Sequence, residues 1–135
     1  MGAAQATVVL EVDFASDPKS PLISPNAPTI RQSVLPGTAA RGLVVMSATD
    51  RDQRPLEDNE TGMSLFTRYF IQGLSGHADV APLGNGDGVV DSAEAFVFAA
   101  SRTAIVARKL SGVLQRPTLS QLKSVPLGKL GGAVR

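Results

Sequence analysis

The 135-residue sequence contains no cysteine, no tryptophan and a single histidine, His77. The absence of cysteine excludes disulfide bonds, thiolate metal sites and a cysteine nucleophile on this chain. One histidine is too few for a histidine-rich zinc site. Aromatic residues make up only 4% of the sequence, so a surface that stacks the bases of single-stranded nucleic acid is not expected.

The sequence also lacks an excess of charge and a long apolar run. Thirteen Lys and Arg residues face twelve Asp and Glu residues, which gives a formal net charge of +1. A basic surface for nucleic acid is therefore not expected, and no stretch reaches the ~18 apolar residues of a transmembrane helix. Residues 1–6 form a poor secretory signal because their side chains are small and uncharged. We expect a cytoplasmic protein without a nucleic-acid or membrane partner.

The length and a 43% content of hydrophobic residues predict one globular domain over residues 1–135. A run rich in β-branched residues at 7–14 predicts a buried strand that ends in acidic residues, and the apolar run 42–48 predicts a central strand. Between these runs, five prolines punctuate residues 17–40, which predicts a long exposed loop. Residues 120–135 are expected to hold a short strand and a frayed tail.

Two helices are predicted in the second half of the chain. The first has apolar residues at helical spacing, namely Met63, Phe66, Phe70 and Leu74. Thr61 is its expected cap. Asp91 and Glu94 have the spacing of a capping box, which predicts a second helix that runs to about Leu114. Because strands this hydrophobic need cover, the predicted class is α/β with a mostly parallel sheet and flanking helices.

Five segments of the sequence carry a resemblance to a known family. They are Gly42–Gln53, with a strand ending in Ser-Ala before Asp-Gln; Glu57-Asp58; Gly62–Asp79, which ends in Gly-Leu-Ser-Gly-His-Ala-Asp; Gly84–Glu94, with an Asn-Gly-Asp-Gly turn; and Gln115–Leu119, with Pro-Thr-Leu. In this order they resemble the C-terminal part of the bacterial caspase-like and metacaspase-like cysteine peptidases. The resemblance covers residues 42–119 and, more weakly, residues 7–16, and it implies a partial caspase-like fold.

The resemblance places Asp13 where the family has its nucleophilic cysteine. A carboxylate cannot replace a thiolate in acyl transfer from a peptide. The family's histidine, normally about 50 residues before the cysteine, has no counterpart because only twelve residues precede Asp13. The resemblance therefore implies a caspase-family protein or subunit that lacks the Cys/His dyad and is inactive alone. Its partner would be an N-terminal catalytic-half chain or a second copy in a homodimer. The alternative is a non-catalytic peptide-binding pseudopeptidase or interaction module.

Acidic residues follow both predicted strands. Asp50 and Asp52 come after the second strand, and Glu11 lies near the end of the first. By resemblance to metacaspases, an acidic residue near Asp50 and Asp52 helps to line a pocket for an Arg or Lys side chain. Because a planar guanidinium pairs well with carboxylates in a partly desolvated cleft, we expect these three residues to bind peptides that contain Arg or Lys. The alternative is that the aspartates only form turns and face solvent.

Residues 79–94 match much of a calcium-binding loop. With Gly88 at the sixth position, side chains with oxygen ligands fall on positions three, five, nine and twelve, namely Asn85, Asp87, Asp91 and Glu94. The first position is Leu83, so Asp79 would complete the set only if residues 81–84 bulge out. We predict that no cofactor is required and that Ca²⁺ binds weakly at these residues. The alternative is a tight Gly-Asp-Gly turn that leads into a capped helix.

Overall fold

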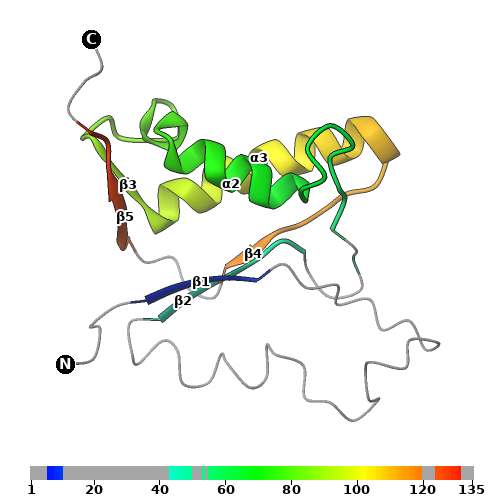
Figure 1. Ribbon diagram of the computed structural model, residues 1–135, viewed down its shortest axis with the longest axis horizontal. Helices are drawn as coiled ribbons and strands as arrows, with labels where there is room; N and C mark the ends of the chain where they lie inside the picture. Colours follow the sequence, from blue (N-terminus) through cyan, green and yellow to red (C-terminus); the bar gives the residue numbers. More distant parts are fainter. Residues whose placement is uncertain (1–5, 11–42, 50–52, 54, 120–123, 132–135) are drawn as a thin grey trace.

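The computed structural model describes residues 6–10, 43–49, 53, 55–119 and 124–131. The elements are, in chain order, β1 (Ala6–Leu10), β2 (Leu43–Ser47), α2 (Leu65–Leu74), the 3-10 helix η2 (His77–Asp79), β3 (Val89–Asp91), α3 (Ser92–Ser111), β4 (Thr118–Leu119) and β5 (Pro126–Lys129). Their arrangement is drawn in Figure 1. Within the described ranges, no helix combines the length and the apolar character that crossing a membrane requires.

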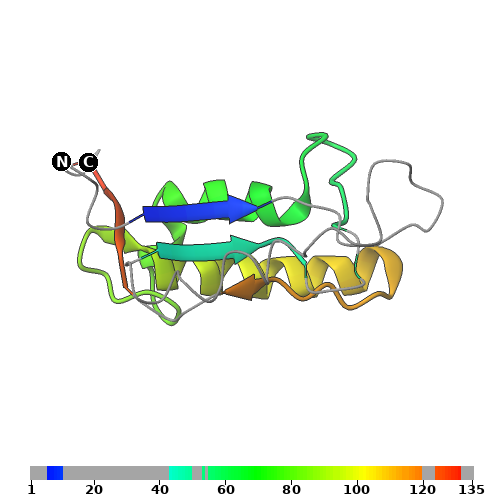
Figure 2. The same ribbon diagram turned by 90° about the horizontal axis from the view of Figure 1, so that it is seen from below.

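The larger sheet has three strands in the order β1-β2-β4. β1 and β2 are parallel, and their register pairs Ala6 with Leu43 and Leu10 with Ser47. β4 is antiparallel to β2, and Figure 2 shows its arrow opposed to the other two. β3 and β5 form a separate antiparallel pair. The α/β class is confirmed as a mixture of helices and strands, but of the two pairings described in the larger sheet only one is parallel.

The antiparallel β4 follows from the two helices that precede it. In Figure 1, α2 runs back along the sheet from the end where β2 finishes, and α3 then runs forward again. A single crossover helix would return the chain for another parallel strand. Two helices instead bring the chain to the carboxyl end of β2, where the next strand can only run backwards. This path also places the residues that follow α3 next to the loop that follows β2.

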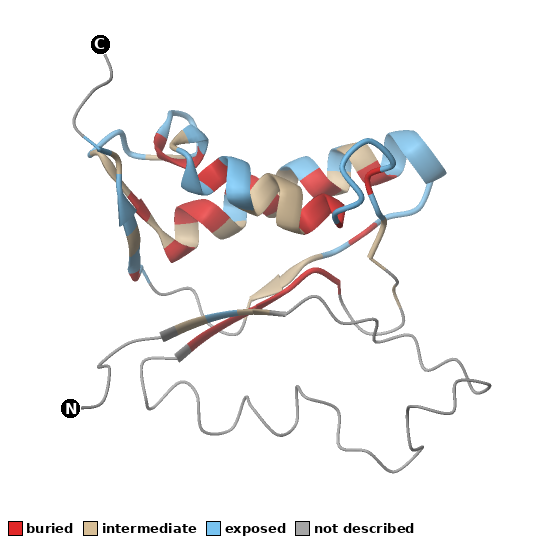
Figure 3. Cartoon of the chain, viewed as in Figure 1, coloured by how far each residue is buried: buried red, intermediate tan, exposed pale blue. Residues whose placement is uncertain are grey.

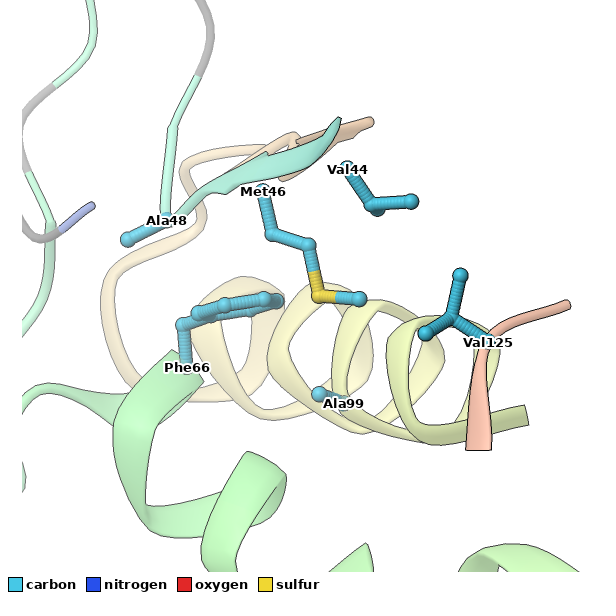
Figure 4. Packing of buried hydrophobic residues seen from close by; sticks show 6 residues of the cluster. All are labelled: Val44, Met46, Ala48, Phe66, Ala99 and Val125. Atoms are coloured by element: carbon cyan, nitrogen blue, oxygen red, sulfur yellow. The ribbon is translucent and has the colours of Figure 1, made fainter. Parts of the chain in front are cut away.

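The main core lies between the larger sheet and the two helices, which both cover the same face of it (Figures 1 and 2). Its buried cluster, drawn in Figure 4, consists of Val44, Met46, Ala48, Phe66, Ala99 and Val125. Val44, Met46 and Ala48 are fully buried. Since successive residues of a strand point to opposite faces, this alternation along β2 directs one row of side chains onto Phe66 of α2 and Ala99 of α3.

A second buried cluster joins the smaller sheet to the helices. It consists of Ala78, Val90, Ala95 and Phe98, and Figure 3 shows buried residues continuing from the helices to this end of the molecule. Gly73 lets α2 approach closely, because a Cβ there would lie 3.2 Å from the Phe98 ring and 3.3 Å from the Ala78 methyl. The two clusters share the partly buried Tyr69 and Phe70 and so form one packed unit.

The first predicted helix begins later than its apolar spacing indicated. Ser64, not Thr61, is the N-cap of α2, and its hydroxyl accepts a hydrogen bond from the Thr67 N–H. The Thr61 hydroxyl instead donates to Asp58. Of the four predicted apolar positions only Phe66 is fully buried, and Met63 is 42% exposed because it precedes the helix. The spacing was correct for the helix but not for its start.

The second predicted helix and the late strand are confirmed, with shorter bounds. α3 has the predicted capping box at Asp91 and Glu94, but it ends at Ser111 rather than at about Leu114, because the C-cap Gly112 takes a left-handed conformation (φ 69°) that stops the helix. β5 supplies the short strand expected within 120–135. The predicted loop 17–40 lies outside the described residues.

Candidate functional site

The parallel pair β1–β2 defines the edge of the sheet where the sequence predicts a site. Leu10 is level with Ser47 in the register, so the chain leaves both strands at the same edge. Side chains that follow parallel strands meet at such an edge and form the usual crevice of an α/β sheet. The predicted site residues Glu11, Asp13, Asp50 and Asp52 follow these two strand ends in the sequence, and all four lie outside the described residues.

Two glutamine side chains hold the loop after β2. Gln115, which is 1% exposed, donates from Nε2 to the Ala48 carbonyl (2.9 Å) and accepts at Oε1 from the Leu56 N–H (3.0 Å). Gln53, within the loop, donates to the Leu114 carbonyl (2.6 Å) and accepts from the Arg116 N–H (2.8 Å). We call this the Gln53–Gln115 pair. It fixes both ends and one interior point of the loop that contains Asp50 and Asp52.

Sequence reasoning gave the Gln53–Gln115 pair no role. Both residues stand in segments that carry the family resemblance, but their partners are 61 and 67 positions away along the chain. No local pattern encodes such a contact. One signal in the sequence was that Gln115 follows the second predicted helix. A polar residue that becomes buried at such a point must find hydrogen-bond partners.

Asp58 anchors the next part of the chain to α2. Its carboxylate accepts from the Thr61 hydroxyl (2.8 Å), from the Glu60 N–H (3.3 Å) and from Arg68 Nη1 (2.5 Å). The hydrogen bond from Thr61 contributes most to lowering the pKa of Asp58, and the Glu60 N–H and the charge of Arg68 lower it further, while burial opposes them. These contacts fix the turn that connects the loop to the start of α2.

The hydroxyl groups at the end of β2 have no activating base among the described residues. Ser47 Oγ donates to the carbonyl of Thr49 (3.0 Å). Thr49 is 1% exposed, and its Oγ1 has no hydrogen-bond partner in the described part of the chain. A serine or threonine nucleophile needs a histidine or lysine within hydrogen-bond reach. His77 lies in η2 and instead has its Nδ1 3.2 Å from the Gln72 carbonyl.

The loop between η2 and α3 is built around Asp79, which is 5% exposed. Its Oδ1 accepts from the Asp87 N–H (3.1 Å), and its Oδ2 accepts from the Gly88 N–H (3.0 Å). The Gly84 N–H bonds to the Val80 carbonyl (3.0 Å), which closes residues 80–84 into a turn of their own. The condition under which Asp79 could serve as the first position of the calcium loop is therefore met.

The other predicted calcium ligands are also tied to backbone amides. Glu94 accepts from the Asn85 N–H (3.0 Å) and from the Asp91 N–H (3.2 Å). Asp91 in turn accepts from the Glu94 N–H (2.8 Å), which completes the capping box. In the part of the chain that the structure describes, no three His, Asp or Glu side chains are grouped so as to hold a metal ion. Each carboxylate oxygen has a second lone pair, so an ion would share these groups with the amides.

Comparisons with known proteins add no relative to this description. No protein-family model, no curated protein and no solved structure matches the chain.

Proposed function

We propose that this chain is a caspase-like protein without a catalytic dyad, that it binds peptide segments containing Arg or Lys, and that it cleaves no peptide by itself. The observation that carries the proposal is the parallel β1–β2 pair, whose carboxyl ends are level at Leu10 and Ser47. The family resemblance puts the nucleophile position after the first strand and the pocket after the second. The register of the pair is consistent with that assignment.

The chemistry of the strand ends favours a cationic ligand. Glu11, Asp13, Asp50 and Asp52 all follow these ends within five residues of the sequence. Carboxylates that line a partly desolvated crevice accept the paired N–H groups of a guanidinium more strongly than neutral acceptors do. The Gln53–Gln115 pair supports this proposal because it holds Ala48, Gln53 and Leu56, which flank in the sequence two of the four acids, to the segment that follows α3.

The proposal excludes catalysis by the chain alone on chemical grounds. The sequence has no cysteine, and a carboxylate at position 13 cannot carry an acyl group from a peptide to water as a thiolate does. Peptidase activity would need a partner chain that supplies both the nucleophile and the base. β1 is an edge strand of the described sheet, so a strand from such a partner, or from a second copy, has an edge to join. A cytoplasmic location stays part of this proposal.

Peptide binding tests the proposal directly. A labelled peptide with Arg and Lys is titrated with the chain and followed by fluorescence anisotropy, beside a peptide of the same length in which Glu replaces both. The chain should bind the basic peptide, and Asp50→Asn combined with Asp52→Asn should weaken binding about tenfold, the equivalent of one charge-assisted hydrogen bond. Glu60→Gln, at an exposed carboxylate elsewhere, is the matched control. Equal binding of the acidic peptide would contradict the proposal.

We propose calcium binding by the 79–94 loop as a second, independent function. The observation in its favour is that residues 80–84 form a separate turn, which brings the Asp79 carboxylate to the amides of Asp87 and Gly88. We expect a dissociation constant of about 0.1–1 mM, the range of weak modules. Glu94→Gln preserves a capping box but removes a charged ligand, so it should abolish the heat of calcium binding in titration calorimetry. No heat with the unaltered chain at millimolar Ca²⁺ would end this proposal.

A further inference from the structure

The 79–94 loop contains two sequences that are prone to spontaneous cyclisation, Asn85-Gly86 and Asp87-Gly88. In this reaction the backbone nitrogen of the glycine attacks the side-chain carbonyl carbon of the preceding residue. A C–N bond forms, and ammonia leaves from asparagine or water leaves from aspartate, which gives a five-membered succinimide. Water then opens the ring at either carbonyl to yield aspartate or its β-linked isomer. Glycine favours the attack because it has no Cβ to obstruct it.

Both glycine amides of these sequences are hydrogen-bonded to one residue, Asp79. The Gly86 N–H donates to the Asp79 backbone carbonyl (2.8 Å), and the Gly88 N–H donates to Asp79 Oδ2 (3.0 Å). In each case the nitrogen that would attack is already engaged. Before it can reach the side-chain carbon, this hydrogen bond must open.

The side chains that would be attacked are also held. Asn85 Oδ1 accepts from the Asp87 N–H (2.8 Å), and Asp87 Oδ1 accepts from the Val89 N–H (2.8 Å). Both side chains are exposed to water, which is the second reactant. Burial therefore does not protect these two residues, and the protection that exists must come from the hydrogen bonds.

We propose that Asn85 is a latent deamidation site and Asp87 a latent isomerisation site, and that Asp79 keeps both unreacted in the folded chain. Gly84 is part of this arrangement, because its lack of a side chain lets the chain pass directly against the backbone of Asp79. A Cβ at position 84 would lie 2.2 Å from the Ala78 carbonyl oxygen and from the Asp79 carbonyl carbon. Deamidation would place a new carboxylate beside Glu94, which accepts from the Asn85 N–H. A β-linked product would lengthen the backbone between Asp79 and the cap of α3.

Ageing the chain tests the proposal, in mildly alkaline buffer for Asn85, where the attacking glycine amide is more readily deprotonated, and in mildly acidic buffer for Asp87, whose carboxyl group must be protonated to leave as water. Deamidation of the peptide that contains Asn85 is followed by mass spectrometry, and β-linked aspartate is followed by enzymatic methylation. The folded chain should react at least about tenfold more slowly than the chain in urea, since one net hydrogen bond represents about a two- to tenfold effect and several act together. Equal rates in both conditions would overturn the proposal.

Variants separate the role of Asp79 from general stability. Asp79→Ala should accelerate the reaction at Asp87 about tenfold or more and the reaction at Asn85 less, because the Gly86 N–H donates to the Asp79 backbone carbonyl, which alanine retains. Asp58→Ala removes another buried carboxylate and should leave the rates of the folded chain unchanged. Gly84→Ala should accelerate both reactions while it retains the Asp79 carboxylate.

If Asp79→Ala fails to fold, the Asp79→Asn variant tests the role of Asp79 in its place. Its amide has one acceptor oxygen, so the Asp87 N–H and the Gly88 N–H cannot both keep their acceptor, whereas the Gly86 N–H keeps the Asp79 backbone carbonyl, and Asp87 should react faster relative to Asn85 than before. Equal acceleration by Asp79→Ala and Asp58→Ala, or an unchanged ratio with Asp79→Asn, would overturn the role of Asp79.

Discussion

Replacement of Gln115 by alanine tests the Gln53–Gln115 pair, on which the restraint of the loop after β2 depends. The substitution removes two hydrogen bonds from a side chain that is 1% exposed and leaves the Ala48 carbonyl and the Leu56 N–H without these partners. An unsatisfied buried polar group costs about 1–3 kcal/mol. With two such groups left unsatisfied, we expect the free energy of unfolding to fall by about 2–4 kcal/mol. That is a large fraction of the ~5–15 kcal/mol by which domains are stable.

Urea unfolding followed by circular dichroism measures this effect, because the chain has no tryptophan to report by fluorescence. The transition should move to lower urea with an unchanged slope. Two further variants provide comparisons for the loss of stability in Gln115→Ala. Gln115→Glu keeps the acceptor for the Leu56 N–H but turns a carboxylate oxygen toward the buried Ala48 carbonyl, so its loss should be at least as large as that of Gln115→Ala. Gln53→Ala acts at exposed bonds and should cost at most about 1 kcal/mol. A loss below about 0.5 kcal/mol for Gln115→Ala would refute the reasoning.

The remaining predictions concern the core, the helix cap and pH. Phe66→Ala should destabilise the chain by about 3–5 kcal/mol in the same urea assay, because Phe66 is fully buried, and a loss below about 1 kcal/mol would disprove its place in the core. Asp91→Ala should cost about 1–2 kcal/mol through loss of the α3 cap, and Asp91→Ser should restore most of it. The pKa of Asp58 lies below its ordinary value of 3.8, with the Thr61 hydrogen bond as its main cause. Its contribution to stability is therefore present above pH 3.8 and is lost as pH falls through the lower pKa of the folded state. Asp58→Asn should reduce the loss of stability on acidification, and an unchanged pH profile would contradict this assignment.

Features that depend on neighbouring residues could be predicted from the sequence. The apolar run of β2, the Asp91–Glu94 capping box and the helical spacing around Phe66 are local patterns, and the structure contains all three elements. The start of α2 was misjudged because two hydroxyl residues, Thr61 and Ser64, both stand where a cap is plausible. Asp58 decides between them, since it takes the Thr61 hydroxyl as a partner.

Features that depend on distant residues could not be predicted. The antiparallel β4 results from the packing of α2 and α3 on one face of the sheet, and two residues are too short to give a strand pattern. The role of Gln115 depends on carbonyl and amide groups that only the fold brings near. The same holds for Asp79, which sequence spacing offered as a calcium ligand and which the fold surrounds with backbone amides. The predicted role of the acidic residues after β1 and β2 rests on the resemblance and on the order of the strands in the sequence.

The central claim is that the carboxyl edge of β1 and β2 binds basic peptide segments, and mapping amide chemical shifts during titration tests it most directly. The account predicts that an Arg- and Lys-containing peptide will shift the amides at the ends of these strands, around Leu10 and Ser47, and those of the loop that leads to Gln53. The amides of β3 and β5 should stay unchanged, and the peptide should remain intact throughout. Shifts confined to the smaller sheet, or cleavage of the peptide by the purified chain, would contradict the account.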